Sequence, residues 1–210
     1  MSDAKVTKIL IVFYSRYGNT ARMAEEIAYG AKELDGIAVT LKRIADDIPM
    51  EVVSKDPSWS KIVEDLNNRI PTTPIEDIMH ELPKHHTIIF GSPTRFGNMA
   101  APMKALWDMT SDFWVKGSLI GKVGAVFTSA ASVHGGQETT AVSMMFPILH
   151  HGMIIVGVPY SVPELTGSGS PYGPSRIVGS LSTKKIEEAD IKVAQALGKR
   201  VAQISRKLSS

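Results

Sequence analysis

Cysteine is absent from the sequence, which has 210 residues. This absence excludes a disulfide framework, catalysis by a thiol and zinc sites built from thiolates, and it fits a reducing compartment. The sequence also lacks an apolar signal segment at its N-terminus and any apolar run long enough to span a membrane. We therefore expect a cytoplasmic protein that does not insert into membranes.

A strong charge of either sign is missing as well, because the formal net charge is +2 and the basic residues form no block. This argues against a nucleic-acid partner. The six histidines show no i, i+4 pair of the kind that binds metals on a helix, so we expect no metal site. Internal repeats are absent and 43% of the residues are apolar, which predicts a single domain over residues 1–210.

Two nucleotide-binding motifs, GxGxxG and GxxxxGK[ST], do not occur, which disfavours a Rossmann dinucleotide site and a P-loop NTPase. The sequence instead contains KILIVFYSRYGNT at residues 8–20, an apolar run followed by a loop and then by apolar residues at helical spacing. Such a strand–loop–helix unit directs backbone N–H groups and hydroxyls to one point, as in phosphate sites. The alternative is a turn without a ligand, capped by Asn19 or Thr20.

Strands and helices alternate along the rest of the chain. We expect strands at 9–13, 37–44, 85–91, 122–128 and 153–158, and helices at 23–34, 58–68, 100–109, 139–151 and 184–208. The strands are apolar throughout, which is typical of a parallel sheet covered on both faces. The predicted fold is α/β, a doubly wound parallel five-stranded sheet with helices on both faces. Residues 50–83 are expected to form a surface connection, with oligomer contacts as the alternative.

Three loops that contain glycine and hydroxyl residues directly follow predicted strands, at residues 15–20, 92–98 and 129–138. In a parallel sheet these loops meet at the carboxyl edge, where ligands bind. The first loop suits a phosphate. The second offers an aromatic ring and a guanidinium, and the third has small residues that let the backbone approach a flat ligand. A flat aromatic ligand with a single phosphate, such as FMN, would use all three loops.

Two aromatic residues are candidates for walls beside such a ligand. Tyr17 belongs to the first loop, and Trp114 is expected in a loop after the helix at 100–109. Ordinary packing is the alternative for both side chains, and a surface ion pair is the alternative for Arg95 in the second loop.

The segments YSRYGNT, IIFGSPTRFGNMAAPMKALWD, HGGQETT, LHHGM and SPYGPSRIVG span about residues 8–179. In these motifs the sequence resembles the WrbA-type NAD(P)H:quinone oxidoreductases, which are flavoproteins with a flavodoxin-like fold. The resemblance implies bound FMN, a homotetramer, and two-electron transfer from NADH or NADPH to a quinone.

The resemblance also implies roles for individual residues. The implied cofactor-binding residues are Ser15, Arg16, Tyr17, Gly18, Asn19, Thr20, Thr94, Arg95, Phe96, Gly97, Asn98, Ser129, Ala130, Ala131, Ser132, Val133, His134 and His150. Tyr17 would also contact the nicotinamide, Trp114 would contact the quinone, and His150 would assist catalysis through a hydrogen bond or proton delivery. The third loop departs from the family at AASVH, so His134 either changes the polarity near the flavin or is an ordinary loop residue.

The implied mechanism is ping-pong, because nicotinamide and quinone would use the same face of the flavin in turn. A rival hypothesis is a non-enzymatic electron carrier of the flavodoxin kind, which would need a charged docking face that this sequence does not provide. A third hypothesis is an interaction module without a ligand, which would be colourless.

Overall fold

A mostly parallel sheet is the centre of the described part of the chain, which comprises residues 6–46, 48–180, 182 and 184–209 of a computed structural model. The strands are β1 (Thr7–Phe13), β2 (Ile37–Ile44), β3 (Thr72–Thr73), β4 (Thr87–Arg95), β5 (Asn98–Met99), β6 (Val123–Ala130), β7 (Ile154–Ile155) and β8 (Ser175–Ile177). Their order is β3-β2-β1-β4-β6-β7, with β8 beside β6 and with β5 antiparallel to β4. The central strands β1, β4 and β6 are buried almost throughout, which explains their continuous apolar sequences.

The predicted parallel α/β sheet is confirmed, but the prediction of five strands is wrong, because the described residues form eight. The strand expected at 153–158 is divided into two pieces. β7 pairs with the start of β6, at Val123 and Gly124, and β8 pairs with its end, from Thr128 to Ala130. Between these pieces the chain makes a detour that contains Pro159, Pro163 and Pro171. Proline has no N–H to donate to a sheet ladder, so the edge position passes from β7 to β8.

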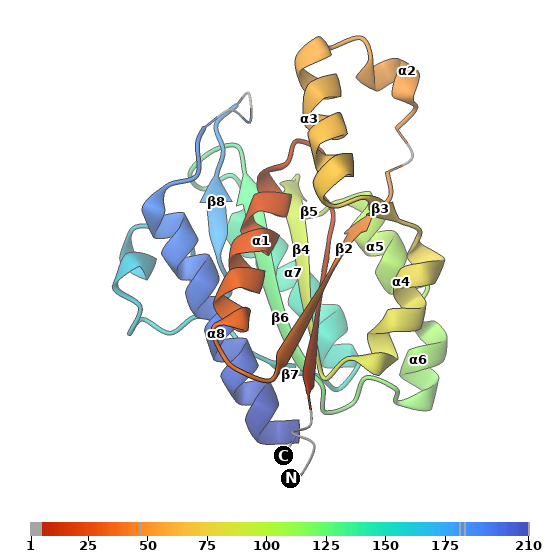
Figure 1. Cartoon of the computed structure of the whole chain (residues 1–210), viewed down its shortest axis with the longest axis vertical. Helices are drawn as coiled ribbons and strands as arrows, with labels where there is room; N and C mark the ends of the chain where they lie inside the picture. Colours follow the sequence, from red (N-terminus) through yellow and green to blue (C-terminus); the bar gives the residue numbers. More distant parts are fainter. Residues whose placement is uncertain (1–5, 47, 181, 183, 210) are drawn as a thin grey trace.

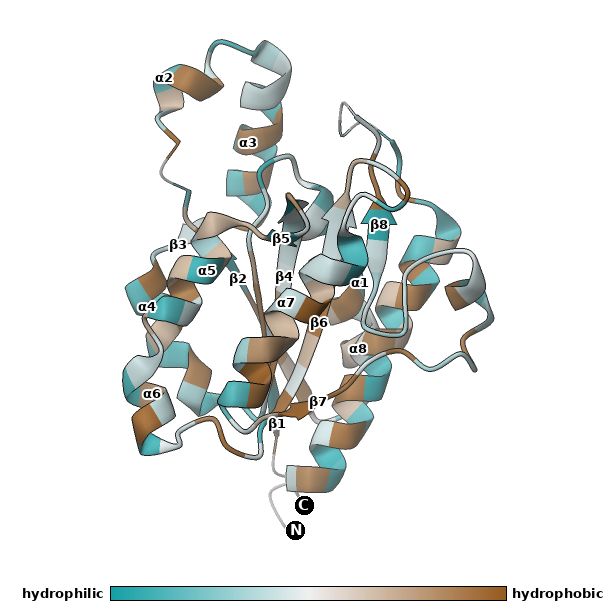
Figure 2. Cartoon of the chain, turned by 180° about the vertical axis from the view of Figure 1, so that it is seen from behind, coloured by the Kyte–Doolittle hydropathy of each residue, from teal (hydrophilic) through white to brown (hydrophobic). Residues whose placement is uncertain are grey.

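Helices cover both faces of the sheet, as Figures 1 and 2 show from opposite sides. They are α1 (Asn19–Lys32), α2 (Met50–Val53), α3 (Pro57–Arg69), α4 (Ile75–Glu81), α5 (Ala101–Asp108), α6 (Ser111–Lys116), α7 (Gln137–His150) and α8 (Glu188–Ser209), with 3₁₀ turns η1 (Leu82–Lys84) and η2 (Pro163–Thr166). One apolar core lies between the sheet and the pair α1 and α8, and a second core lies between the sheet and α4, α5 and α7. The expected double winding of the chain is therefore present.

The helices α1 and α8 approach each other very closely at two glycines. A Cβ atom added to Gly30 would lie 2.1 Å from the carbonyl oxygen of Gln195, and one added to Gly198 would lie 2.0 Å from that of Ile27. These positions therefore require glycine. The tight contact holds α1, whose first two residues, Asn19 and Thr20, belong to the phosphate loop predicted from the sequence.

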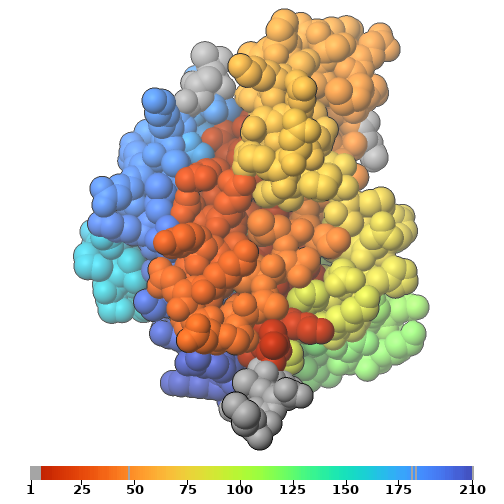
Figure 3. All heavy atoms as spheres, in the orientation of Figure 1, coloured from red at the N-terminus to blue at the C-terminus, as the bar shows by residue number. Residues whose placement is uncertain are grey.

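The segment between β2 and β3 is more than a surface connection. Its helix α3 stands beyond the carboxyl edge of the sheet, above the start of α1 (Figures 1 and 3). The helix predicted at 58–68 is confirmed, but its cap is Asp56, whose carboxylate accepts hydrogen bonds from the N–H groups of Ser58 and Trp59 at 2.9 and 3.2 Å.

Two further boundaries differ from the sequence prediction. Trp114 lies in the short helix α6 and not in a loop. Gly117 ends this helix, with a φ of +64° that suits glycine. The last helix starts at Glu188, four residues after the predicted start. None of the helices in the described ranges has both the length and the apolar character that crossing a membrane requires.

Candidate functional site

The loop from Ser15 to Thr20 leaves a row of backbone donors unpaired. Ser15 Oγ accepts a hydrogen bond from the N–H of Ala21 at 3.1 Å, and the carbonyl of Gly18 accepts one from Arg22 at 2.9 Å. The N–H groups of residues 16–20 donate to no other described residue. Gly18 has a φ of +80°, which turns the chain into α1. A helix N-terminus and several free N–H groups at one point form a site for a phosphate.

Hydrogen bonds between side chains join this loop to the two other loops predicted from the sequence. Thr20 Oγ1 lies 3.1 Å from Ser129 Oγ, which connects the first loop to the third. Thr94 Oγ1 accepts a hydrogen bond from Thr140 Oγ1 at 2.8 Å and donates one to the carbonyl of Gly136 at 3.4 Å. The second loop is thereby tied to the third loop and to α7. The predicted meeting of three loops at the carboxyl edge of the sheet is present in the structure.

Two glycines allow the second and third loops to touch. A Cβ atom added to Gly136 would lie 2.8 Å from Cα of Gly97 and 3.1 Å from its nitrogen. Both glycines also have positive φ values, +98° for Gly136 and +76° for Gly97. Any other residue at position 136 would therefore separate the two backbones.

These loops surround a cavity of about 110 Å³, which we call the phosphate cradle. The residues that line it are Ser15, Arg16, Tyr17, Asn19, Thr20, Pro93, Thr94, Arg95, Ser129, Ala130, Ala131, Val178 and Ser182. Hydroxyl groups and unpaired N–H groups suit the phosphate end of FMN, and the volume is too small for the whole cofactor. The small side chains of Ala130 and Ala131 leave room for a larger group to continue along the third loop.

Two residues of the cradle, Val178 and Ser182, lie outside the three predicted loops and come from the segment after β8. Pro93 belongs to the predicted second loop but was not among the implied cofactor-binding residues, and it lies within β4. Asn19 Nδ2 donates a hydrogen bond to the carbonyl of Ser182 at 3.1 Å, across 163 positions of sequence. The motif SPYGPSRIVG at 170–179 was a signal for this fourth contributing segment.

The charge of Arg16 is engaged outside the cradle. Its Nε donates a hydrogen bond to the hydroxyl of Tyr14 at 3.0 Å and lies 3.6 Å from a carboxylate oxygen of Asp46. The Tyr14 hydroxyl in turn donates to Asp46. Burial, together with the carboxylate of Asp46, raises the pKa of Tyr14 to about 12, so this hydroxyl stays protonated at neutral pH. The cradle therefore depends on neutral donors more than on Arg16.

The remaining residues of the second and third loops lie around the cradle and not inside it. Phe96 is fully exposed at the tip of the turn between β4 and β5, with a φ of +54°. Val133 and His134 line a separate cavity of about 390 Å³ beside η2 and the start of α8. Ser132 accepts a hydrogen bond from the N–H of Gly135 at 3.0 Å through its carbonyl.

Trp114, which the resemblance implies as the quinone contact, and His150, which it implies as a flavin-site and catalytic residue, lie outside the cradle. Trp114 and His150 line a cavity of about 570 Å³ on the face covered by α5, α6 and α7, which we call the aromatic hollow. Its wall includes Trp107, Phe146 and His151, and Asn98 of the second loop lies at its border. Trp114 is 59% exposed. Neither Trp114 nor His150 lines the phosphate cradle of the same chain.

The floor of the aromatic hollow contains a fixed histidine. Thr110 Oγ1 donates its proton to the carbonyl of Trp107 at 2.7 Å, so it accepts from His151 Nε2, which lies 2.8 Å away. The His151 ring lies against Trp107, with centroids 5.8 Å apart. Burial, and secondarily the neighbouring His150, lowers the pKa of His151, which favours the neutral ring.

The chain is similar to known proteins over most of its length. Residues 7–166 match the family model of NADPH-dependent FMN reductases. A protein named NAD(P)H dehydrogenase (quinone) from Aromatoleum aromaticum is 42% identical, over 96% of this chain and 97% of its own length. A protein of the same name from Geotalea daltonii is 44% identical, over 96% of this chain and 98% of its own length.

A flavodoxin, WrbA-like protein from Agrobacterium tumefaciens has the same fold, with a TM-score of 0.64 and 23% identity over 96% of this chain and 98% of its own. The fold is thus flavodoxin-like, and the resemblance that the motifs predicted is confirmed.

Proposed function

Because the chain belongs to the family of NADPH-dependent FMN reductases, we propose that it is an FMN-dependent NAD(P)H:quinone oxidoreductase. The names of the two relatives, each more than 40% identical over nearly the whole chain, support this activity. The observation that carries the proposal is the phosphate cradle, where five consecutive N–H groups, at residues 16–20, have no partner within the described chain. A single cradle of this size suits FMN, which has one phosphate.

The chain's own residues bind and orient the cofactor. The N–H groups of residues 16–20 and the hydroxyls of Ser15 and Thr20 would hold the phosphate, and the backbone of the second and third loops would support the ring. When bound, FMN supplies the redox chemistry, namely acceptance of hydride from a nicotinamide and two-electron reduction of a quinone. Tyr17, which is 39% exposed at the mouth of the cradle, offers its ring to the nicotinamide. Binding of both substrates at one face gives ping-pong kinetics.

The protein works as a homotetramer in this proposal. Trp114 and His150 line the aromatic hollow and are separated from the phosphate cradle of their own chain. A second copy that presents its hollow to the cradle would bring Trp114 over the quinone and His150 to the flavin. The exposure of Trp114, Val115, Phe146 and Leu149 on this face supports such a contact between copies.

The proposal is tested with the purified protein. We expect a flavin absorption spectrum, release of FMN and not FAD on denaturation, and turnover of NADH or NADPH with benzoquinone by the protein alone. Parallel lines in double-reciprocal plots would support the ping-pong order. A protein that holds FMN but reduces no quinone would be an electron carrier, and a colourless protein that takes up no FMN would contradict the proposal entirely.

A further inference from the structure

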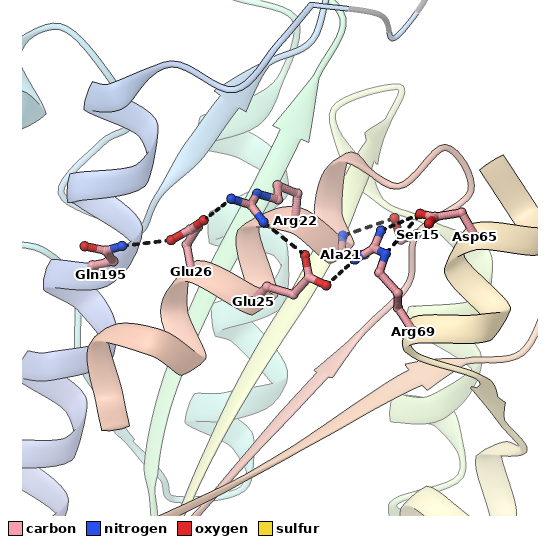
Figure 4. A network of polar contacts seen from close by, with 8 residues as sticks. All are labelled: Ser15, Ala21, Arg22, Glu25, Glu26, Asp65, Arg69 and Gln195. Atoms are coloured by element: carbon pink, nitrogen blue, oxygen red, sulfur yellow. Dashed lines mark hydrogen bonds and ion pairs between the residues drawn. The ribbon is translucent and has the colours of Figure 1, made fainter. Parts of the chain in front are cut away.

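Helix α3 is firmly attached to the rest of the molecule at its C-terminal end. Arg69 pairs with Glu25 of α1 and, within α3, with Asp65 at 2.9 Å, and Glu25 also faces Arg22, as Figure 4 shows. The buried Arg43 of β2 donates a hydrogen bond from Nε to the carbonyl of Ile70 at 2.9 Å. These contacts hold α3 in a fixed position above the phosphate loop, so its N-terminal half can act on that loop.

Trp59, near the start of α3, makes two contacts with the phosphate loop. Its indole Nε1 donates a hydrogen bond to the carbonyl of Arg16 at 3.3 Å. Its ring also lies against the ring of Tyr17, with centroids 5.5 Å apart and an interplanar angle of 47°. Below Trp59, Ile62 and Leu66 lie within 3.8–3.9 Å of the position that a Cβ on Gly18 would occupy. One indole thus touches both the backbone and the side chain of the loop.

The contact with the Arg16 carbonyl determines the direction of the next N–H group. In a trans peptide unit the C=O and N–H bonds point in opposite directions, and the described residues contain no cis peptide. When the Arg16 carbonyl faces Trp59 on the α3 side, the N–H of Tyr17 points to the other side of the loop. That N–H has no partner among the described residues, and both Arg16 and Tyr17 line the phosphate cradle.

We propose that Trp59 is a positioning residue with two separable roles. Through its N–H group it holds the Arg16–Tyr17 peptide so that the Tyr17 N–H serves as a phosphate donor. Through its ring it supports the Tyr17 ring as a platform for the nicotinamide. The second role rests on the proposed quinone reductase activity, and the first requires only that the cradle binds FMN.

The first role is tested by comparing FMN with riboflavin, which lacks the phosphate. The full-length protein is freed of cofactor and titrated with each flavin, following the quenching of flavin fluorescence. Trp59→Phe keeps a ring but loses the N–H group, so we expect its Kd for FMN to rise about 5-fold while the Kd for riboflavin stays within about 2-fold of wild type. Equal changes for the two flavins, or no change for either, would overturn this role.

The second role is tested by kinetics at saturating FMN. Trp59→Ala leaves Tyr17 without its neighbouring ring, so we expect the KM for NADH to rise about 5-fold with the KM for benzoquinone unchanged, and Trp59→Phe to restore the wild-type value. Wild-type KM values for both substrates in Trp59→Ala would overturn it. If the wild-type protein binds FMN but does not oxidise NADH, the proposed function and this second role both fail, and the titration still decides the first.

Ile62→Ala is the matched control on the same helix, because it removes packing near Gly18 and keeps the indole ring and its N–H group. We expect a lower melting temperature with the wild-type ratio of FMN to riboflavin affinity. If Trp59→Ala behaves in the same way, losing only thermal stability, Trp59 is a packing residue and the proposal is wrong. If Trp59→Ala does not fold, the two predictions for Trp59→Phe remain and either can contradict the proposal.

Discussion

The phosphate cradle and the aromatic hollow are built in different ways. The cradle is a small cavity of about 110 Å³ between loops at the carboxyl edge, and its backbone donors are unpaired. The hollow is about 570 Å³, lies between helices α5, α6 and α7, and is lined mainly by rings and aliphatic groups. Of its buried nitrogens, His151 Nε2 is paired with Thr110, whereas His151 Nδ1 and Trp107 Nε1 have no hydrogen-bond partner among the described residues.

This difference indicates what each region does alone. The cradle offers directed donors at fixed positions, so a single chain can bind a phosphate there. The hollow offers apolar area, and its residues Trp114 and His150 do not line the cradle of their own chain, so the roles proposed for them require the flavin of another copy. In the proposed homotetramer, one chain therefore binds the cofactor and presents Tyr17 to the nicotinamide, and a second copy contributes Trp114 and His150.

Gly136→Ala should break the cradle and leave the hollow intact. Its Cβ would lie 2.8 Å from Cα of Gly97, so the second and third loops must separate. We expect the Kd for FMN to rise about 100-fold, as for the loss of one or two hydrogen bonds to a charged group.

Gly121→Ala is the matched control for this change, because Gly121 also has a positive φ, +75°, but has nothing within 4 Å of the added Cβ. It should lose stability without losing FMN affinity, as measured by titration. An equal decrease of FMN affinity in both variants would show that backbone strain, and not the contact between the loops, explains the effect.

Asn19→Asp should raise the Kd for FMN by about 30-fold. A carboxylate would face both the phosphate and the carbonyl of Ser182, which Asn19 now contacts at 3.1 Å. Asn19→Ala removes the contact with Ser182 without adding a charge, and the Kd for FMN should rise only a few-fold. Calorimetric titration of both variants measures the difference. If Asn19→Asp binds FMN like wild type, the side chain points away from the phosphate.

Trp114→Ala should leave the cradle intact and impair the hollow. We expect the kcat/KM for quinone to fall about 10-fold, or about 1.4 kcal/mol, within the range of aromatic stacking. Tyr29→Ala, which removes an exposed aromatic ring from α1 on the opposite face, should have no effect. The samples are matched for FMN content and for elution volume in size exclusion. Wild-type kcat/KM values for NADH and quinone in the matched sample would remove Trp114 from the site.

The smallest expected effect is a pH dependence of stability from His151. Burial lowers its pKa in the folded state, so the unfolded state takes up the proton first as the pH falls. The contribution of the neutral ring to the free energy of unfolding is therefore complete above the ordinary histidine pKa, and it is lost as the pH falls below that value. His151→Gln should show a shallower decrease of melting temperature between pH 7 and pH 5, whereas His80→Gln, at an exposed site on α4, should follow wild type. Identical slopes for His151→Gln and wild type would contradict this.

The cradle was largely predictable from sequence because its elements are contiguous. Strand, SRYGNT loop and helix follow each other directly, and the same order after β4 and β6 indicates that the loops meet. Trp59 was not predictable, since its partner Tyr17 lies 42 positions earlier and only the packing of α3 brings them together. The elements α6 and β8 were missed because six and three residues are too few for a periodic pattern. Gly117 was the available signal for the end of α6.

The division between cradle and hollow is tested most directly by mixing two damaged chains. Gly136→Ala and Trp114→Ala are produced together with different affinity tags, and oligomers that contain both are purified. In these, FMN is bound by the Trp114→Ala chains, and the Gly136→Ala chains supply intact Trp114. We predict that turnover of benzoquinone per bound FMN rises well above that of Trp114→Ala alone. Turnover per FMN that stays at the level of Trp114→Ala would show that the two regions do not meet across copies.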